Sequence, residues 1–180
     1  MKKLIIALVL IVGFSINAQE IKWMSLEEAV AAQKVTPKKI MLDAYTVWCG
    51  PCKMLDKKTF KNKDVANYVN ENFYAVKFNA EGNETVNFLG NTFTNPNFDS
   101  SKGNGRNSSH QLSQYFGIRA YPTIVFLDED ANLIAPLPGY KTPQQLELYL
   151  KLFKSDDFKT ITEQGDWEAY QQNFKYAFKD

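Results

Sequence analysis

The chain has 180 residues, of which 44% are hydrophobic and 23% charged, enough for one domain with a well-filled core. Its formal net charge is only +1, so neither sign of charge points to nucleic acid or to an acidic surface, and we expect no nucleic-acid binding. Only two cysteines are present, which excludes a framework of structural disulfides.

The N-terminus differs in composition from the rest of the chain. Lys2 and Lys3 precede an apolar run over residues 4–14, and Ala18 is a small residue at a plausible cleavage point. This pattern predicts a secretory signal peptide over residues 1–18, and hence a periplasmic or secreted protein. The run is shorter than the ~20 apolar residues of a transmembrane helix, so we expect no membrane span after cleavage.

The first half of the chain predicts helices alternating with two strands. Ser25 and Glu28 have the spacing of a capping box, so the first helix is expected to begin here and to end near Lys34. The next elements are a strand over 39–45, a helix over 53–58, a helix capped at Asn62 and a strand over 73–79.

From about residue 80 to 109, asparagine, glycine, serine and threonine dominate the sequence. This composition predicts a long inserted surface loop, with a helical turn around residues 85–89. A lid that contacts the substrate is the alternative role. His110 follows the loop, and we expect it to be a surface residue near a helix cap rather than a ligand.

Regular structure returns after the loop. The pattern predicts a helix over 111–116, a strand over 123–127, a turn, a strand over 133–137 and a helix from Thr142-Pro143 to about 153. This order of elements is typical of an α/β fold whose mixed sheet has an early parallel part and a closing antiparallel hairpin.

The C-terminal segment over residues 155–180 is an addition to this pattern. Ser155 and Asp156 can cap one helix, and Gly165 can end it. A second helix would carry an apolar stripe, most simply packed on its own domain, with a partner surface as the alternative; the stripe consists of Trp167, Tyr170, Phe174 and Phe178.

Cys49 and Cys52 are separated by two residues, at the point where the strand over 39–45 leads into the helix over 53–58. A Cys-x-x-Cys pair in this setting indicates a redox site rather than a structural staple. The free amides and positive dipole end of a helix start stabilise a thiolate, the attacking form, on the first cysteine. We therefore expect an exposed sulfur at Cys49 and a less exposed one at Cys52.

Two further hypotheses concern the chemistry around the cysteine pair. Asp43 lies in an apolar run over 40–44, where burial should raise its pKa. A carboxylate of raised pKa near Cys52 could take the proton of that thiol, and a turn residue at the end of the strand is the alternative role. The two thiolates could instead hold Cu(I), which is the alternative from another class of protein. A closed zinc site is not expected from one cysteine pair and one histidine, and we predict no resident metal or cofactor.

The stretch Trp48-Cys49-Gly50-Pro51-Cys52 resembles the active-site pentapeptide of the thioredoxin family. Four further matches follow in the family's order over about residues 39–153. Asp43 matches the family's buried aspartate, and Lys77 matches the lysine next to that aspartate. Tyr121-Pro122 matches the segment with the cis-proline, and Gly139 matches a glycine beside the active site. The resemblance implies a thioredoxin-like fold, a mixed central sheet with flanking helices. The domain would span 19–154, with the inserted loop at about 80–109 and a C-terminal helical extension over 155–180.

The resemblance also implies a thiol–disulfide oxidoreductase. Cys49 would attack, Cys52 would resolve the mixed disulfide, and Asp43 with Lys77 would assist. The rim that receives a partner segment would consist of Trp48, Gly50, Pro51, Tyr121, Pro122 and Gly139.

The dipeptide between the cysteines carries no charge, which favours reduction of partner disulfides over oxidation or isomerisation, the alternatives. The expected partners are protein disulfides and an upstream thiol electron donor, for which a membrane thiol–disulfide transporter is one candidate.

Overall fold

The structure is a computed structural model that describes residues 20–179. The predicted signal peptide over 1–18 lies outside these residues. Within the described part, no helix combines the length and the apolar character that crossing a membrane requires.

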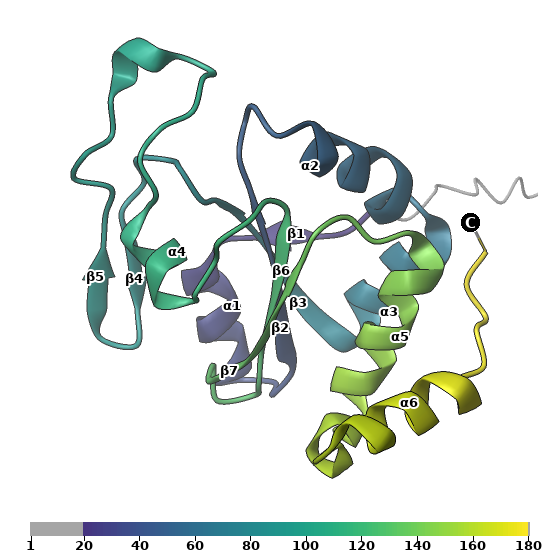
Figure 1. Cartoon of the computed structure of the whole chain (residues 1–180). Coiled ribbons are helices and arrows are strands. Elements are labelled where there is room, and N and C mark those ends of the chain that lie inside the picture. The colour runs from purple at the N-terminus through teal and green to yellow at the C-terminus, as the bar shows by residue number, and fades with distance from the viewer. Residues whose placement is uncertain (1–19, 180) are drawn as a thin grey trace, which may run out of the picture.

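A five-stranded sheet with the order β1-β3-β2-β6-β7 forms the centre of the fold (Figure 1). β2 and β1 run parallel to β3, whereas β6 runs antiparallel to β2 and β7 antiparallel to β6. The mixed sheet with a closing hairpin is therefore confirmed. The strands are β1 (Trp23–Met24), β2 (Lys39–Tyr45), β3 (Phe73–Asn79), β6 (Thr123–Leu127) and β7 (Leu133–Pro138).

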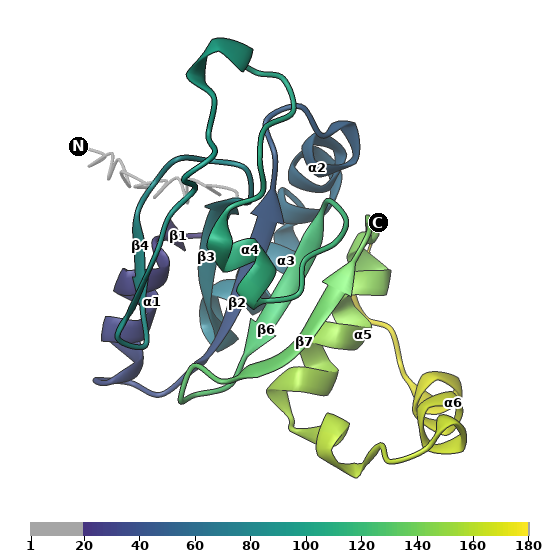
Figure 2. The ribbon, with the colours of Figure 1, turned by 60° about the vertical axis from the view of Figure 1, so that its left-hand side comes forward.

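Helices cover both faces of the sheet (Figures 1 and 2). The predicted caps are present: Ser25 forms a capping box with Glu28, and the side chains of Asn62 and Thr142 accept backbone N–H groups. The helices are α1 (Leu26–Gln33), α2 (Gly50–Met54), which continues as a π-helical turn over Leu55–Phe60, α3 (Lys63–Asn72), α4 (Gln111–Tyr115), α5 (Pro143–Lys154) and α6 (Gln164–Asn173).

Strand alternation divides the core of the protein between the two faces of the sheet. Ile40 and Leu42 of β2 pack with α1 and α4, whereas Met41 packs with the π-helical turn, α3 and α5. Because side chains alternate along a strand, Asp43 shares the face of Met41 and points to the layer that contains the helix after the cysteines.

The inserted segment is more ordered than its composition predicts. The expected helical turn at 85–89 is wrong, because β4 (Val86–Phe88) and β5 (Asn91–Phe93) form a hairpin there. Its two-residue turn, Leu89-Gly90, has positive φ at both positions, which suits the twist of a hairpin. Farther along, only a single 3-10 turn over Ser100–Lys102 interrupts the loop.

His110 is a helix cap, as expected, but the expectation of a surface position is wrong. It is the N-cap of α4 and is fully buried. Its Nδ1 accepts the Leu112 N–H at 3.1 Å, so its Nε2 donates to the Glu84 carbonyl at 2.8 Å. This residue fastens the start of the inserted segment to α4.

The C-terminal extension differs from the prediction in two ways. Gly165 does not end a helix, because it is the second residue of α6, which follows a 3-10 turn over Asp157–Thr160. α6 stops at Asn173, so Phe174 and Phe178 lie beyond it rather than on its face. The expected packing on the protein's own domain is confirmed, since Phe178 is buried in the core that contains α3 and α5.

A buried carboxylate holds residues 177 and 178 in place. Glu147 of α5 is fully buried, pairs with Lys151, and accepts the N–H groups of Ala177 and Phe178, each at 2.9 Å. The N–H of Lys179 donates to Asp64 at 3.1 Å. These contacts tie residues 177–179 to α3 and α5.

Glu147→Ala is expected to lower the free energy of unfolding by about 3 kcal/mol, because two backbone N–H groups and one lysine lose their buried partner. Urea denaturation measures this change. Glu168→Ala, on the exposed side of α6, is the matched control and should change stability by less than about 0.5 kcal/mol. Equal effects of the two substitutions would contradict the role given to Glu147.

Candidate active site

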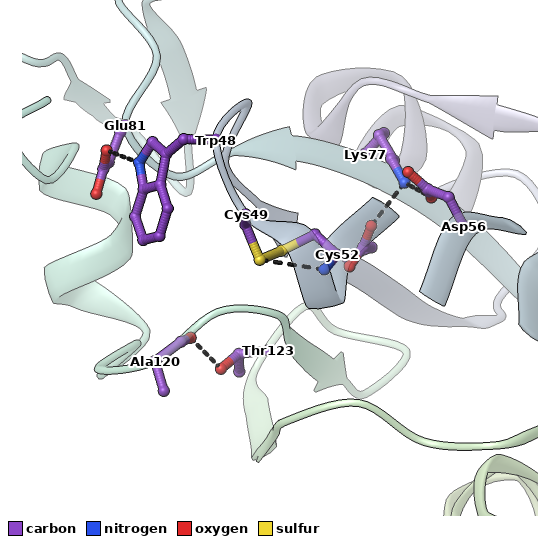
Figure 3. The surroundings of a disulfide bond; sticks show 9 residues. Trp48, Cys49, Cys52, Asp56, Lys77, Glu81, Ala120 and Thr123 are labelled. Atoms are coloured by element: carbon purple, nitrogen blue, oxygen red, sulfur yellow. Dashed lines mark hydrogen bonds and ion pairs between the residues drawn. A yellow bond between two sulfur atoms is a disulfide. The ribbon is translucent and has the colours of Figure 1, made fainter. Parts of the chain in front are cut away.

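The two cysteines lie where β2 leads into α2, and a disulfide joins them (Figure 3). Cys49 is the N-cap residue of α2, and the N–H of Cys52 donates to its Sγ at 3.1 Å. A helix start supplies free amides and a positive dipole end. After reduction of the disulfide, this position therefore stabilises a thiolate on Cys49.

Both cysteines are nearly inaccessible in the disulfide form: Cys49 is 1% exposed and Cys52 2%. The expectation of an exposed Cys49 sulfur is therefore wrong for this form. Figure 3 shows the reason, since the Trp48 ring lies beside the disulfide and the segment from Ala120 to Thr123 lies across from it. A partner sulfur can reach Cys49 only when the groups around it move.

Asp43 is buried and forms an ion pair with Lys77, which is partly exposed. The two residues are register partners on β2 and β3, and Lys77 Nζ lies 2.7 Å from Asp43 Oδ2. Lys77 also pairs with Asp56, one turn beyond Cys52 (Figure 3). The lysine thus links the buried carboxylate to the helix that begins at the cysteines.

The environment of this pair shifts the pKa of both side chains. Burial raises the pKa of Asp43 to about 6; the Lys77 charge opposes this rise, and the Asp56 charge adds to it. Burial alone would lower the pKa of Lys77, but the two carboxylates outweigh it and raise that pKa. Asp43 Oδ1 has no hydrogen-bond partner among the described residues. One carboxylate oxygen is therefore free to accept a proton near neutral pH.

Aromatic rings enclose Lys77. Its Nζ lies 4.8 Å from the ring centroid of Trp23, 5.1 Å from that of Tyr45 and 5.3 Å from that of Phe60. Such cation–π contacts hold the ammonium in place without a further hydrogen bond. Trp23 comes from β1, the two-residue strand that the sequence pattern did not predict.

The Tyr121-Pro122 peptide bond is cis, as the resemblance implies. The Pro122 carbonyl accepts the Gly139 N–H at 2.8 Å, and Thr123 Oγ1 donates to the Ala120 carbonyl at 2.7 Å. Gly139 has φ +83°, in the left-handed region that favours glycine. These bonds fix the segment that lies across from the disulfide.

The structure brings the predicted rim residues together around the cysteines. Tyr121 packs edge-to-face on Trp48, with ring centroids 5.9 Å apart, and Gly50 and Pro51 are exposed at the start of α2. Three contributors escaped the sequence analysis because no local pattern marks them: Asp56, Glu81 and Arg106. Within residues 20–179, no three histidine, cysteine or acidic side chains form a group able to hold a metal.

A cysteine pair at a helix start, opposite a cis-proline at the same end of a mixed sheet, defines a thiol–disulfide oxidoreductase of the thioredoxin type. Residues 26–154 match the family described as the thioredoxin-like domain, and the chain belongs to this family. No curated protein sequence matches the chain.

Solved structures of low sequence identity share the fold. A thioredoxin-fold protein from Helicobacter pylori is 21% identical, with a TM-score of 0.59 over 85% of this chain and 88% of that one. A thioredoxin from Thermus thermophilus is 14% identical, with a TM-score of 0.54 over 74% and 87%. A candidate disulphide isomerase from Bacteroides thetaiotaomicron is 29% identical, with a TM-score of 0.51 over 76% and 94%.

Proposed function

We propose that this protein reduces the disulfides of exported client proteins. The observation that carries the proposal is the position of Cys49 at the start of α2, where it accepts the Cys52 N–H, with no charged residue between the two cysteines. Strongly oxidising members of the family place a histidine in that dipeptide, which stabilises the reduced form, whereas Gly50-Pro51 offers no such group.

In the proposed reaction the Cys49 thiolate attacks one sulfur of the client disulfide. A bond forms between Cys49 and that sulfur, and the other client sulfur leaves as a thiolate that takes up a proton. Cys52 then attacks Cys49 Sγ, which closes the Cys49–Cys52 disulfide and releases the second client thiolate. Two electrons pass from the protein's dithiol to the client.

Asp43 is proposed to accept the proton of the Cys52 thiol during the second step. Its burial, its raised pKa near 6 and the free Oδ1 support this role. Lys77 would hold the other oxygen at 2.7 Å, and Asp56 would hold Lys77. In this arrangement Lys77 is a positioning residue.

The location and the partners are part of the proposal. The pattern over residues 1–18 supports export to the periplasm or the exterior. Each turnover leaves a Cys49–Cys52 disulfide, so a second dithiol protein must return two electrons to it. A membrane thiol–disulfide transporter would carry these electrons across the membrane into the oxidising compartment. Isomerisation is the second candidate, because the relative with 29% identity is described as a candidate isomerase.

The equilibrium reduction potential of the Cys49–Cys52 couple tests the proposed direction. We expect a value closer to the ~ −270 mV of thioredoxin than to the ~ −120 mV of the oxidant DsbA. Equilibration with glutathione buffers, followed by alkylation and mass measurement, gives this value. A potential near about −120 mV would show that the protein oxidises its clients instead.

A further inference from the structure

An exposed guanidinium, that of Arg106, stacks on Trp48 next to the disulfide. We infer that Arg106 makes this protein select client segments with aspartate or glutamate beside the disulfide. The inference rests on the proposed function, because it names the clients of that same site.

Arg106 reaches the active site from the inserted segment. Its guanidinium carbon lies 4.4 Å from the ring centroid of Trp48, the residue that precedes Cys49. The side chain is exposed, and among the described residues its guanidinium has no hydrogen bond or ion pair. Any segment that covers Trp48 on its way to Cys49 therefore meets a cation with unused N–H donors.

The inserted segment holds Arg106 in this position. The next residue, Asn107, donates its N–H to Glu81 Oε2 at 2.8 Å, and the same oxygen accepts the Trp48 Nε1–H at 2.7 Å. The Asn107 side chain also exchanges hydrogen bonds with the backbone of Asp99, at 2.9 and 2.8 Å. One carboxylate thus fixes both the indole and the backbone beside Arg106.

A buried asparagine fastens the same segment to the rest of the domain. Asn95 is 7% exposed, and its Nδ2 donates to the carbonyls of Gly82 and Ser108 at 2.9 and 2.8 Å. Its Oδ1 accepts the Ser108 hydroxyl at 2.6 Å. The backbone that carries Arg106 is therefore held by hydrogen bonds before a client binds, which lowers the conformational entropy lost on binding.

Basic residues predominate in the chain segments near the disulfide, where Glu81 is the acid that contacts Trp48. The segments over 47–54, 104–109, 117–123 and 137–141 contain no aspartate or glutamate, although the chain has 20 acidic residues in total. Their basic residues are Lys53, Arg106, Arg119 and Lys141. Lys141 is occupied by the carbonyls of Pro138 and Gly139, and Glu81, the nearby acid, is engaged by Trp48 and Asn107.

This chemistry fits a carboxylate on the client. A guanidinium offers paired N–H donors in the geometry of a carboxylate and stacks on an aromatic ring at the same time. Complementary charge at an exposed rim acts mainly on the rate of association, and salt screens it. The selectivity should therefore appear as faster reduction, at low salt, of disulfides that are flanked by aspartate or glutamate.

The test compares three synthetic peptides with the same internal disulfide, flanked by two aspartates, two asparagines or two lysines. Stopped-flow fluorescence gives the second-order rate constant of reduction by the reduced protein, and division by the rate with dithiothreitol removes differences in intrinsic reactivity. We expect the aspartate peptide to react about tenfold faster than the lysine peptide at low salt, and less than about twofold faster in about 0.5 M NaCl.

Arg106→Gln is expected to slow reduction of the aspartate peptide about threefold more than it slows reduction of the asparagine peptide. Lys154→Gln, which removes an exposed charge at the end of α5, is the matched control and should change neither rate. Equal rates for the three peptides would overturn the inference, as would an equal slowing of all three by Arg106→Gln. If the wild-type protein reduces none of the peptides, the proposed function itself fails.

Discussion

Cys49→Ser is expected to abolish reduction of a model disulfide such as that of insulin, lowering kcat/KM by at least about 10³-fold, because the remaining thiol, Cys52, lies inside α2 rather than at its N-cap. Cys52→Ser should also stop turnover, but for a different reason. It leaves the attacking thiolate intact and removes the group that releases the client. The Cys52→Ser protein should therefore accumulate a mixed disulfide through Cys49 Sγ.

Mass spectrometry of the trapped species distinguishes the two variants. The adduct of Cys52→Ser should contain one client chain on Cys49, and a small thiol should reduce this mixed disulfide and release the client. Both variants lack the Cys49–Cys52 bond, so reduced wild-type protein is the matched control for folding. An adduct on Cys52 in the Cys49→Ser variant, forming at the same rate, would contradict the assigned roles.

Asp43→Asn is expected to stabilise the oxidised protein at pH values above 6. The pKa of Asp43 is about 6 in the folded protein against an ordinary value of 3.8, so the folded state favours the protonated carboxyl. The stability that this group contributes is complete below pH 3.8 and is lost as the pH rises through about 6. At 1.36 kcal/mol for each pH unit, the loss amounts to about 3 kcal/mol.

The amide carries no charge to desolvate, and Lys77 keeps Asp56 as its partner. Urea denaturation between pH 4 and pH 8 should therefore show a gain for Asp43→Asn of up to about 3 kcal/mol at pH 8 that shrinks toward pH 4. Asp130→Asn, in the exposed turn between β6 and β7, is the matched control and should show no such trend. A gain that does not depend on pH would contradict the burial of a titrating carboxyl.

The same substitution separates stability from catalysis. Without the carboxylate, attack of Cys52 on the mixed disulfide should slow by about 10²-fold, the usual contribution of a general base. Single-turnover release of the client measures this step. The wild-type rate should rise with pH as Asp43 ionises, and the Asp43→Asn rate should lack that rise.

Much of the fold follows from local sequence patterns. β2 and β3 coincide with the predicted strands because each is a mainly apolar run bounded by a clear helix signal, such as the cap at Asn62. β1 has only two residues and depends on its pairing with β3, so no periodicity could reveal it. The β4–β5 hairpin was also hidden, because three-residue strands show too little alternation to exclude a helical turn.

Some residues of the site can likewise be predicted from the sequence, and others cannot. The cysteine pair is found from its spacing and Asp43 from its apolar surroundings, whereas Lys77 is found only from the family resemblance. Glu81 and Arg106 act on Trp48 only because the inserted segment folds back across it. The burial of Cys49 is likewise a tertiary effect, since it depends on side chains and backbone from segments far apart in the chain.

Alkylation of the reduced, folded protein tests the central claim most directly, namely that Cys49 carries a reactive thiolate at the start of α2. Iodoacetamide should modify Cys49 and leave Cys52 intact, as peptide mapping would show. The rate should rise with pH around a midpoint near the ~7 known for thioredoxin, below the ~8.5 of a free thiol. Faster modification of Cys52, or a Cys49 that stays unreactive until the protein is unfolded, would contradict the account.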